Sequence, residues 1–149
     1  FRVGSAHDLP LEDDSVDVVY GIAILHHLDL DLASREVFRV LKKGGRAIFS
    51  EPVRNSRFLR FVRSLIPYET ADVSPFERPL TETELAKFSA PFSGYKARAF
   101  SLPFVNALEV SGAPSSIQSK CIGIDGKLLR TFPRLSHFAA VRVFEVVKE

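Results

Sequence analysis

Short apolar runs flank one strongly amphipathic segment in the first third of the chain. Val16–Tyr20 is β-branched and almost wholly apolar, which predicts a strand buried on both faces, and Ala47–Ser50 predicts a second. Between them, Leu32–Leu41 has helical periodicity. Its apolar face consists of Ala33, Val37, Val40 and Leu41, and Arg35, Glu36 and Arg39 lie opposite. The order strand, helix, strand predicts a parallel pair joined by a right-handed crossover.

The residues around this helix indicate where it begins and ends. Asp29 or Asp31 can cap its N-terminus. We expect Gly44 to adopt the left-handed conformation that ends a helix, and Gly45 to permit a tight turn into the next strand. In parallel sheets, ligands bind beyond the carboxyl ends of the strands. Gly21-Ile22 and Ser50-Glu51 are therefore expected to face one crevice.

The remaining elements are less regular. Asn55–Ile66 predicts a helix with an apolar arc and an arginine arc, and residues 67–80 form a Pro-rich connection. Thr81–Glu84 (TETE) is a capping box that opens a helix to about Phe88. Tyr95–Leu102 and His137–Val147 alternate like strands. Residues 103–136 indicate only one helix, near Lys127–Phe132, and Phe1–Val3 predicts the end of a strand.

Composition narrows the class of protein. The 149 residues are 46% hydrophobic and 26% charged with a net charge of +2, which suits one globular domain and gives no argument for nucleic acid. No apolar run approaches the roughly 20 residues that span a bilayer. A single cysteine, Cys121, fits a reducing compartment, so we expect a cytoplasmic protein. The chain opens on Phe1 and contains no Met, from which we expect a piece of a longer protein.

Three sequence blocks occur in a specific order. They are AHDLP from Ala6, DSVDVVYGIAILHHL from Asp14, and REVFRVLKKGGRAIFSEP from Arg35. Together they resemble the second half of a class I S-adenosylmethionine-dependent methyltransferase, of the type 11 kind. The resemblance is strong over residues 1–52 and weaker beyond them. It implies an α/β fold: a partial Rossmann-like sheet, from the end of strand three to strand seven of the family, with helices on both faces and an added lid helix.

The resemblance also implies what this sequence lacks. The family's glycine-rich cofactor loop and the acidic residue that binds the ribose would precede Phe1. We therefore expect residues 1–149 to be one N-terminally truncated domain, with a lid or substrate cover at 53–80. This stretch alone is expected to bind S-adenosylmethionine weakly and to be inactive. Without the family's first strand, Val16–Tyr20 is expected to form an open sheet edge.

Several residues are implied in cofactor binding. Ser5-Ala6 occupies the loop where the family often has Asp-Ala, and a hydroxyl can accept the adenine hydrogen bond without charge assistance. Gly21 and Ile22 lie at a strand end that a ligand can approach closely. His26 matches a histidine of the family's LHxL block, near the cofactor. An ordinary turn at Ser5-Ala6 and a simple strand-to-loop turn at Gly21-Ile22 remain the alternatives.

Two residues are candidates for the chemistry itself. His26 could orient a substrate or accept its proton, or it could hold loop backbone instead. Glu51 could orient a substrate hydroxyl or amine, or it could be a surface residue. We expect no metal, because adjacent His26 and His27 point in different directions and no other ligand has a suitable spacing.

The predicted function is methyl transfer from S-adenosylmethionine to a small, lipophilic acceptor, and the alternative is a non-catalytic binding or regulatory module with the same fold. A dehydrogenase is disfavoured because no Tyr-x-x-x-Lys pair is present. A nucleic-acid methyltransferase is disfavoured because YGIA stands where Asn/Asp-Pro-Pro-aromatic is expected.

The expected partner is a small-molecule substrate, with no stable membrane insertion. Arg57, Arg60 and Arg63 could contact anionic lipid peripherally or simply solvate a cover helix. The methyl acceptor and the oligomeric state stay open.

Overall fold

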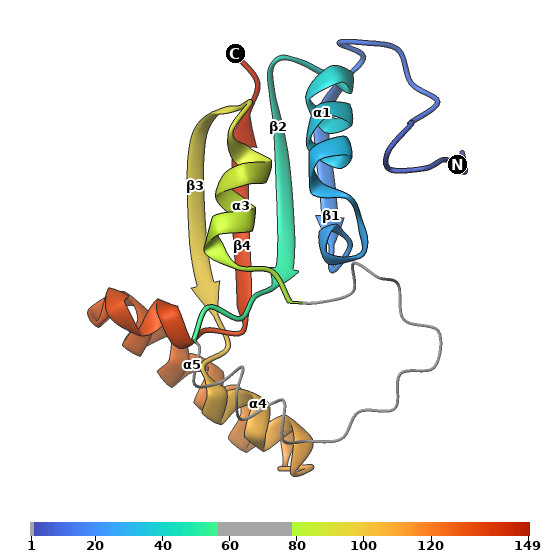
Figure 1. Ribbon diagram of the computed structural model, residues 1–149. Coiled ribbons are helices and arrows are strands. Elements are labelled where there is room, and N and C mark those ends of the chain that lie inside the picture. Colours follow the sequence, from blue (N-terminus) through green and yellow to red (C-terminus); the bar gives the residue numbers. More distant parts are fainter. Residues whose placement is uncertain (1, 57–78) are drawn as a thin grey trace.

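Four strands form one mixed sheet in a computed structural model that describes residues 2–56 and 79–149 (Figure 1). Their spatial order is β1-β2-β4-β3. β1 (Val16–Ile22) runs parallel to β2 (Leu41–Pro52), as the strand-helix-strand pattern predicts. β4 (Val141–Val147) runs antiparallel to both β2 and β3 (Ser93–Phe100). The predicted α/β fold with a partial Rossmann-like sheet is confirmed.

Within residues 2–56 and 79–149, two helices cover one face of the sheet and two lie beyond the carboxyl ends of β2 and β3. α1 (Leu30–Val40) and α3 (Glu82–Ser89) pack side by side over β1, β2 and β4 (Figure 1). α4 (Pro103–Val110) and α5 (Ser115–Thr131) lie past the end of β3. Short 3₁₀ helices occupy Leu25–His27 (η1) and Pro133–Phe138 (η2).

β1 differs from the predicted doubly buried strand. Val18, Tyr20 and Ile22 are 52%, 77% and 73% exposed, because no helix among the described residues covers their face. Val19 points the other way and packs against the core. β1 is also an edge of the four-stranded sheet, as expected. The apolar run therefore identified the strand correctly, but only one of its faces is buried here.

α1 begins where the sequence predicts a cap. Asp29 Oδ1 accepts hydrogen bonds from the N–H groups of Asp31 and Leu32, at 2.9 and 3.0 Å. Ala33, Val37 and Val40 are buried, which confirms the apolar face. The predicted boundaries, Leu32 and Leu41, are displaced by two residues at the start and one at the end.

The glycine pair has a different role from the predicted helix end. α1 ends at Val40, and Gly44 and Gly45 lie inside β2, where the register shifts from Val16↔Leu41 to Val18↔Arg46. Gly44 has the expected positive φ, +78°. A Cβ on Gly45 would approach the Lys42 carbonyl oxygen to 2.8 Å. The two glycines therefore form a bulge between paired strands instead of a helix cap.

The later elements are partly as predicted. The capping box at Thr81 is present, and β3 lies within two residues of its expected position at each end. The predicted helix near Lys127–Phe132 is the end of the much longer α5, and α4 was not predicted. β4 begins at Val141 instead of His137, because η2 occupies Pro133–Phe138. Arg2–Gly4 forms no strand.

Some predictions concern residues outside the described ranges. These are most of the basic helix Asn55–Ile66, most of the Pro-rich connection, and therefore most of the lid expected at 53–80. They stay predictions.

The core joins α3 to the sheet through three aromatic rings. Phe88 of α3 packs edge-to-face against Phe49 of β2 and Phe144 of β4, with ring centroids 5.3 and 6.0 Å apart. All three side chains are almost fully buried, at 3% exposure or less. Edge-to-face geometry adds about 0.5–1.5 kcal/mol per pair to the effect of burial. This cluster fixes the helix layer over β2 and β4.

A second group of contacts holds the N-terminal segment against α1. Glu36 Oε1 accepts from Leu9 N at 2.7 Å and from Arg39 Nη2 at 2.6 Å. Arg39 donates in turn to the carbonyls of Leu9 and Leu11 and to Asp13. Glu36, placed on the polar face by its periodicity, is thus buried and satisfied. The hydrogen bonds from Arg39, and then that from Leu9, lower the pKa of Glu36 despite the opposing effect of burial.

Replacing Glu36 should therefore cost stability in a pH-dependent way. The pKa of the folded state lies below the ordinary value of 4.5, so the stabilisation is present above about pH 4.5 and is lost as the pH falls through the folded pKa. We expect Glu36→Gln to lower the free energy of unfolding by about 1–2 kcal/mol at pH 7. The difference from wild type should shrink below pH 4.5 in urea titrations followed by circular dichroism.

The exposed Glu12 provides a matched control. Glu12→Gln makes the same charge change without losing a buried hydrogen bond, and should leave the free energy of unfolding unchanged. An equal loss in both variants, or a Glu36→Gln loss that is independent of pH, would contradict this account.

Candidate functional site

The carboxyl ends of β1 and β2 meet at one edge of the sheet. Gly21 is the register partner of Phe49, and Ile22 is the partner of Ser50. Ala23 N then donates to the Ser50 carbonyl at 2.8 Å, which carries the pairing one residue beyond β1. Gly21-Ile22 and Ser50-Glu51 therefore lie at the same end of the parallel pair, and that both face one crevice stays a prediction.

Glu51 organises the loop that follows β1. Its side chain is fully buried, at 0% exposure. Oε1 accepts from the N–H groups of Ile24 and Leu25, both at 2.9 Å, and Oε2 lies 3.0 Å from His26 Nδ1. The three contacts satisfy a carboxylate that would otherwise be costly to bury. Glu51 therefore binds the protein's own loop, and its predicted role in orienting a substrate group stays a prediction.

The contact with Glu51 also determines the state of His26. Against an ionised carboxylate, which only accepts hydrogen bonds, Nδ1 of His26 would be the donor. In the neutral ring this leaves the lone pair on Nε2. The His26 side chain is 12% exposed, and its ring lies 4.0 Å from that of His27, centroid to centroid. The site thus presents an oriented imidazole whose second nitrogen can accept a proton.

Gly21 is required by packing against its own core. A Cβ at this position would lie 2.7 Å from Ile24 Cγ2 and 2.8 Å from the Phe49 ring. The neighbouring Ile22 projects to the other face and is 73% exposed at the strand end. The approach of a ligand to Gly21 and Ile22 stays a prediction. The close packing of Ile24 and Phe49 is a separate reason why residue 21 is a glycine.

Ser5 and Ala6 form a turn in the N-terminal segment. Ser5 Oγ accepts from His7 N at 3.2 Å, and the Ser5 carbonyl accepts from Asp8 N at 3.0 Å. His7 Nε2 accepts from Asp29 N at 3.1 Å, which connects this turn to the start of α1. Sequence reasoning missed His7, because no local signal marks a contact between residues so far apart in the chain. The predicted role of Ser5 and Ala6 in binding adenine stays a prediction.

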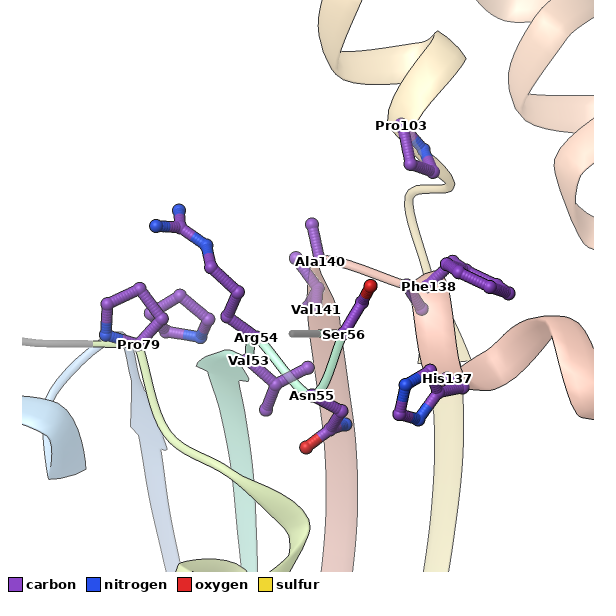
Figure 2. A pocket seen from close by; sticks show the side chains of 12 residues that line it. Val53, Arg54, Asn55, Ser56, Pro79, Pro103, His137, Phe138, Ala140 and Val141 are labelled. Atoms are coloured by element: carbon purple, nitrogen blue, oxygen red, sulfur yellow. The ribbon is translucent and has the colours of Figure 1, made fainter. Parts of the chain in front are cut away.

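A cavity of about 410 Å³ opens just beyond Glu51 (Figure 2). Its wall runs from Pro52 to Ser56, past Pro79 and Pro103, to η2 and the start of β4. Figure 2 shows Pro79 and Arg54 on one side and His137 and Phe138 on the opposite side. The lining is mostly apolar, with a few polar groups, which is typical of small-molecule sites.

Asn55 connects this cavity to the helix layer. Its Oδ1 accepts from Glu82 N at 2.8 Å, and its Nδ2 donates to Glu82 Oε1 at 3.2 Å. Val53 is nearly fully buried and donates its N–H to Ala140 at 2.7 Å. The floor of the cavity is therefore held by backbone and side-chain contacts to two other segments.

The described ranges were also searched for other kinds of site. Among residues 2–56 and 79–149, no three His, Cys, Asp or Glu side chains come together in a way that could hold a metal ion. None of the helices within these ranges is both long and apolar enough to cross a bilayer. Cys121 has a free thiol.

The known sequences to which this chain is similar are methyltransferases. The family described as "Methyltransferase domain" matches residues 1–49. An uncharacterised methyltransferase of Mycobacterium tuberculosis is 28% identical over 140 residues, which cover 91% of this chain and 57% of the relative. A ubiquinone/menaquinone biosynthesis C-methyltransferase of Rubrivivax gelatinosus is 46% identical over 56 residues, 35% of this chain and 22% of the relative. The chain thus spans only part of the length of these relatives.

Solved structures match almost the whole chain. An S-adenosylmethionine-dependent methyltransferase from Thermotoga maritima superposes with a TM-score of 0.58 at 21% identity, covering 98% of this chain and 62% of that one. Geranyl diphosphate C-methyltransferase from Streptomyces coelicolor gives 0.61 at 16% identity, covering 99% and 53%. The chain has the class I methyltransferase fold. In this methyltransferase fold, Gly21 and Glu51 lie at the carboxyl ends of neighbouring parallel strands.

Substituting Gly21 tests how tightly the site loop is packed. We expect Gly21→Ala to lower the free energy of unfolding by about 1–3 kcal/mol, because the added methyl group overlaps Ile24 and Phe49. Chemical denaturation followed by circular dichroism measures the change.

Gly123 on α5 provides the control, since nothing lies within 4 Å of a Cβ built there. Gly123→Ala should be neutral or stabilising by up to about 1 kcal/mol, because alanine favours the helix. Equal stability of Gly21→Ala and wild type would show that the loop has room to adjust.

Proposed function

We propose that the protein transfers a methyl group from S-adenosylmethionine to a small, lipophilic acceptor. The observation that carries the proposal is the buried Glu51, which holds the loop after β1 and orients His26 at the carboxyl end of a parallel strand pair. The class I methyltransferase fold supports the choice of reaction and cofactor. Because the chain spans only part of its relatives, the activity is proposed for the whole protein.

Exposed groups at the strand ends fit one side of the cofactor. The N–H groups of Ala23, Ile24 and Leu25 are already used within the protein, so they are not free to bind a ligand. Ile22 and Ile24 are 73% and 42% exposed, and apolar side chains of this kind suit the flat face of a purine. Gly21 and His26 would complete this side of the site, and Ser5 and Ala6 would contact the adenine edge.

When bound, S-adenosylmethionine supplies a methyl carbon on a sulfonium sulfur, a good leaving group. The remaining tasks of the protein are alignment, exclusion of water and removal of a proton. Such a transfer would form the bond between acceptor and carbon and leave the electron pair of the carbon–sulfur bond on sulfur, so the residues of this site would need only to place the acceptor. If the acceptor atom carries a proton, His26 Nε2 can take it, while Glu51 holds Nδ1–H and stabilises the imidazolium that results.

The acceptor cavity is the 410 Å³ space beyond Glu51. Val53, Phe138 and Val141 provide apolar lining, and Asn55 and His137 provide polar groups. Such a lining favours an acceptor with an apolar body and one hydrogen-bonding end. Phenols and apolar carboxylic acids are the first compounds to test.

Variants of His26 and Glu51 test the mechanism in the full-length protein. We expect His26→Asn to lower kcat about a hundredfold for a hydroxyl acceptor, because the proton acceptor is lost. We expect Glu51→Gln to lower kcat about tenfold, because the imidazole is no longer held in one tautomer. Transfer of a radiolabelled methyl group measures kcat, and calorimetry with S-adenosylhomocysteine measures cofactor binding, which His26→Asn should weaken by a smaller factor than it lowers kcat.

Glu12→Gln is the control for the charge change and should keep wild-type kcat, since Glu12 lies on the exposed N-terminal loop. Full activity of His26→Asn would exclude the proposed proton transfer. Cofactor binding without transfer to any acceptor would favour a non-catalytic module instead.

A further inference from the structure

A second cavity, of about 340 Å³, lies between the end of β3 and the second half of α5. Figure 1 shows α5 beside this end of the sheet. Three arginines from three different elements line it: Arg98 of β3, Arg130 of α5 and Arg142 of β4. The rest of the lining is Ser136 together with apolar residues and Gly126, and it includes no carboxylate.

Two carboxylates on neighbouring elements, Glu82 and Asp125, are engaged elsewhere, and Glu145 lies on the same face of the sheet as Arg98 without an ion pair to it. Glu82 pairs with Arg142 and also accepts from Asn55. Asp125 is almost fully buried and accepts from Ser101 N at 3.1 Å and from Leu102 N at 2.8 Å. Neither Asp125 nor Glu82 pairs with Arg98 or Arg130. Within the described part of the chain, those two guanidinium groups have no ion-pair partner.

Arg142 is held rigidly at the inner wall of the cavity. Only 8% of the residue is exposed, and its Nη2 is fixed by Glu82. Its Nε is buried and has no hydrogen-bond partner among the described residues. The charge of Arg142 is thus offset by Glu82, and the positive charge of the cavity comes from Arg98 and Arg130, which line it from β3 and α5.

We propose that this cavity binds a small organic anion that has an apolar body. Guanidinium groups pair with carboxylate or phosphate oxygens through two parallel hydrogen bonds, which suits Arg98 and Arg130. Phe100 and Leu129 supply apolar surface for the rest of the molecule. Carboxylates and phosphate monoesters share this chemistry, and the experiment below separates them.

The position of the cavity connects it to the candidate active site. Arg142 is the cross-strand register partner of Glu51. The anion would therefore bind one strand away from the residue that orients His26. That the cavity holds an anionic end of the methyl acceptor rests on the proposed function. That it binds an anion at all does not depend on that function.

Titration with benzoate, phenyl phosphate and benzamide tests the site in the full chain without any methyl donor. The amide signals of Gly126 and Ser136, which line the cavity, report binding in nitrogen-proton correlation spectra. We expect saturable shifts with at least one of the two anions, and no saturation with the neutral benzamide. The preferred anion identifies the carboxylate or the phosphate class.

Substitutions of arginine then identify which side chains bind the anion. Arg98→Gln combined with Arg130→Gln should weaken anion binding about tenfold, because two charge-assisted contacts are lost. Arg98 and Arg130 are exposed, so the fold should be retained, and thermal melting checks this. Arg35→Gln on the exposed surface of α1 removes the same kind of charge away from the cavity and should leave binding unchanged.

Three results would overturn the proposal: no saturable shift with either anion, equal binding of benzamide, or equal weakening by Arg35→Gln. Failure of methyl transfer would leave these binding results unaffected, so the two proposals fail separately. The arginine variants could weaken anion binding and leave the KM of an anionic acceptor unchanged. In that case the cavity binds an anion but does not take part in binding the methyl acceptor.

Discussion

The buried carboxylate of Glu51 is the constraint on which the candidate site depends. Removing a carboxylate from water costs several kcal/mol unless its oxygens are satisfied. Among the residues that the structure describes, the donors that reach it are Ile24 N, Leu25 N and the His26 ring. The loop after β1 must therefore keep these groups pointing toward the end of β2. The positive φ of Ala23, 50°, and the short turn at Leu25–His27 are the local consequences.

This constraint acts only because the sheet and the aromatic core hold β2 in place. The parallel pairing aligns Gly21 with Phe49, and the ring of Phe49 fills the space that a side chain at residue 21 would need. The same ring packs against Phe88 and Phe144. The packing of the helix layer and the geometry of the site loop thus share one residue. A substitution in the core near Phe49 should therefore alter the position of the loop that carries His26.

The distribution of charge is the second organising feature. The net charge is only +2, yet arginines gather at the carboxyl end of β2 and at the neighbouring ends of β3 and β4. Arg39, by contrast, is engaged by Glu36 and Asp13 on the N-terminal side of the sheet. Glu36 and Asp13 thus hold the N-terminal segment over α1 through Arg39. At the end of the sheet where ligands bind in folds of this type, Arg98 and Arg130 have no ion-pair partner among the described residues.

The sequence by itself determined the parallel strand pair, the capped helix between them, the capping box at Thr81 and the placement of Glu51 at a strand end. These features follow from local periodicity and from short-range hydrogen bonds, which a linear pattern records. Only the tertiary structure decided that Glu51 turns inward to His26, that Gly44 and Gly45 form a bulge, and that Arg98, Arg130 and Arg142 share a cavity. Each of these depends on contacts between residues far apart in the chain, whose direction is set by strand register and burial. The exposed face of β1 belongs to the same group, because an apolar run shows that a strand can be buried but not which of its faces is covered.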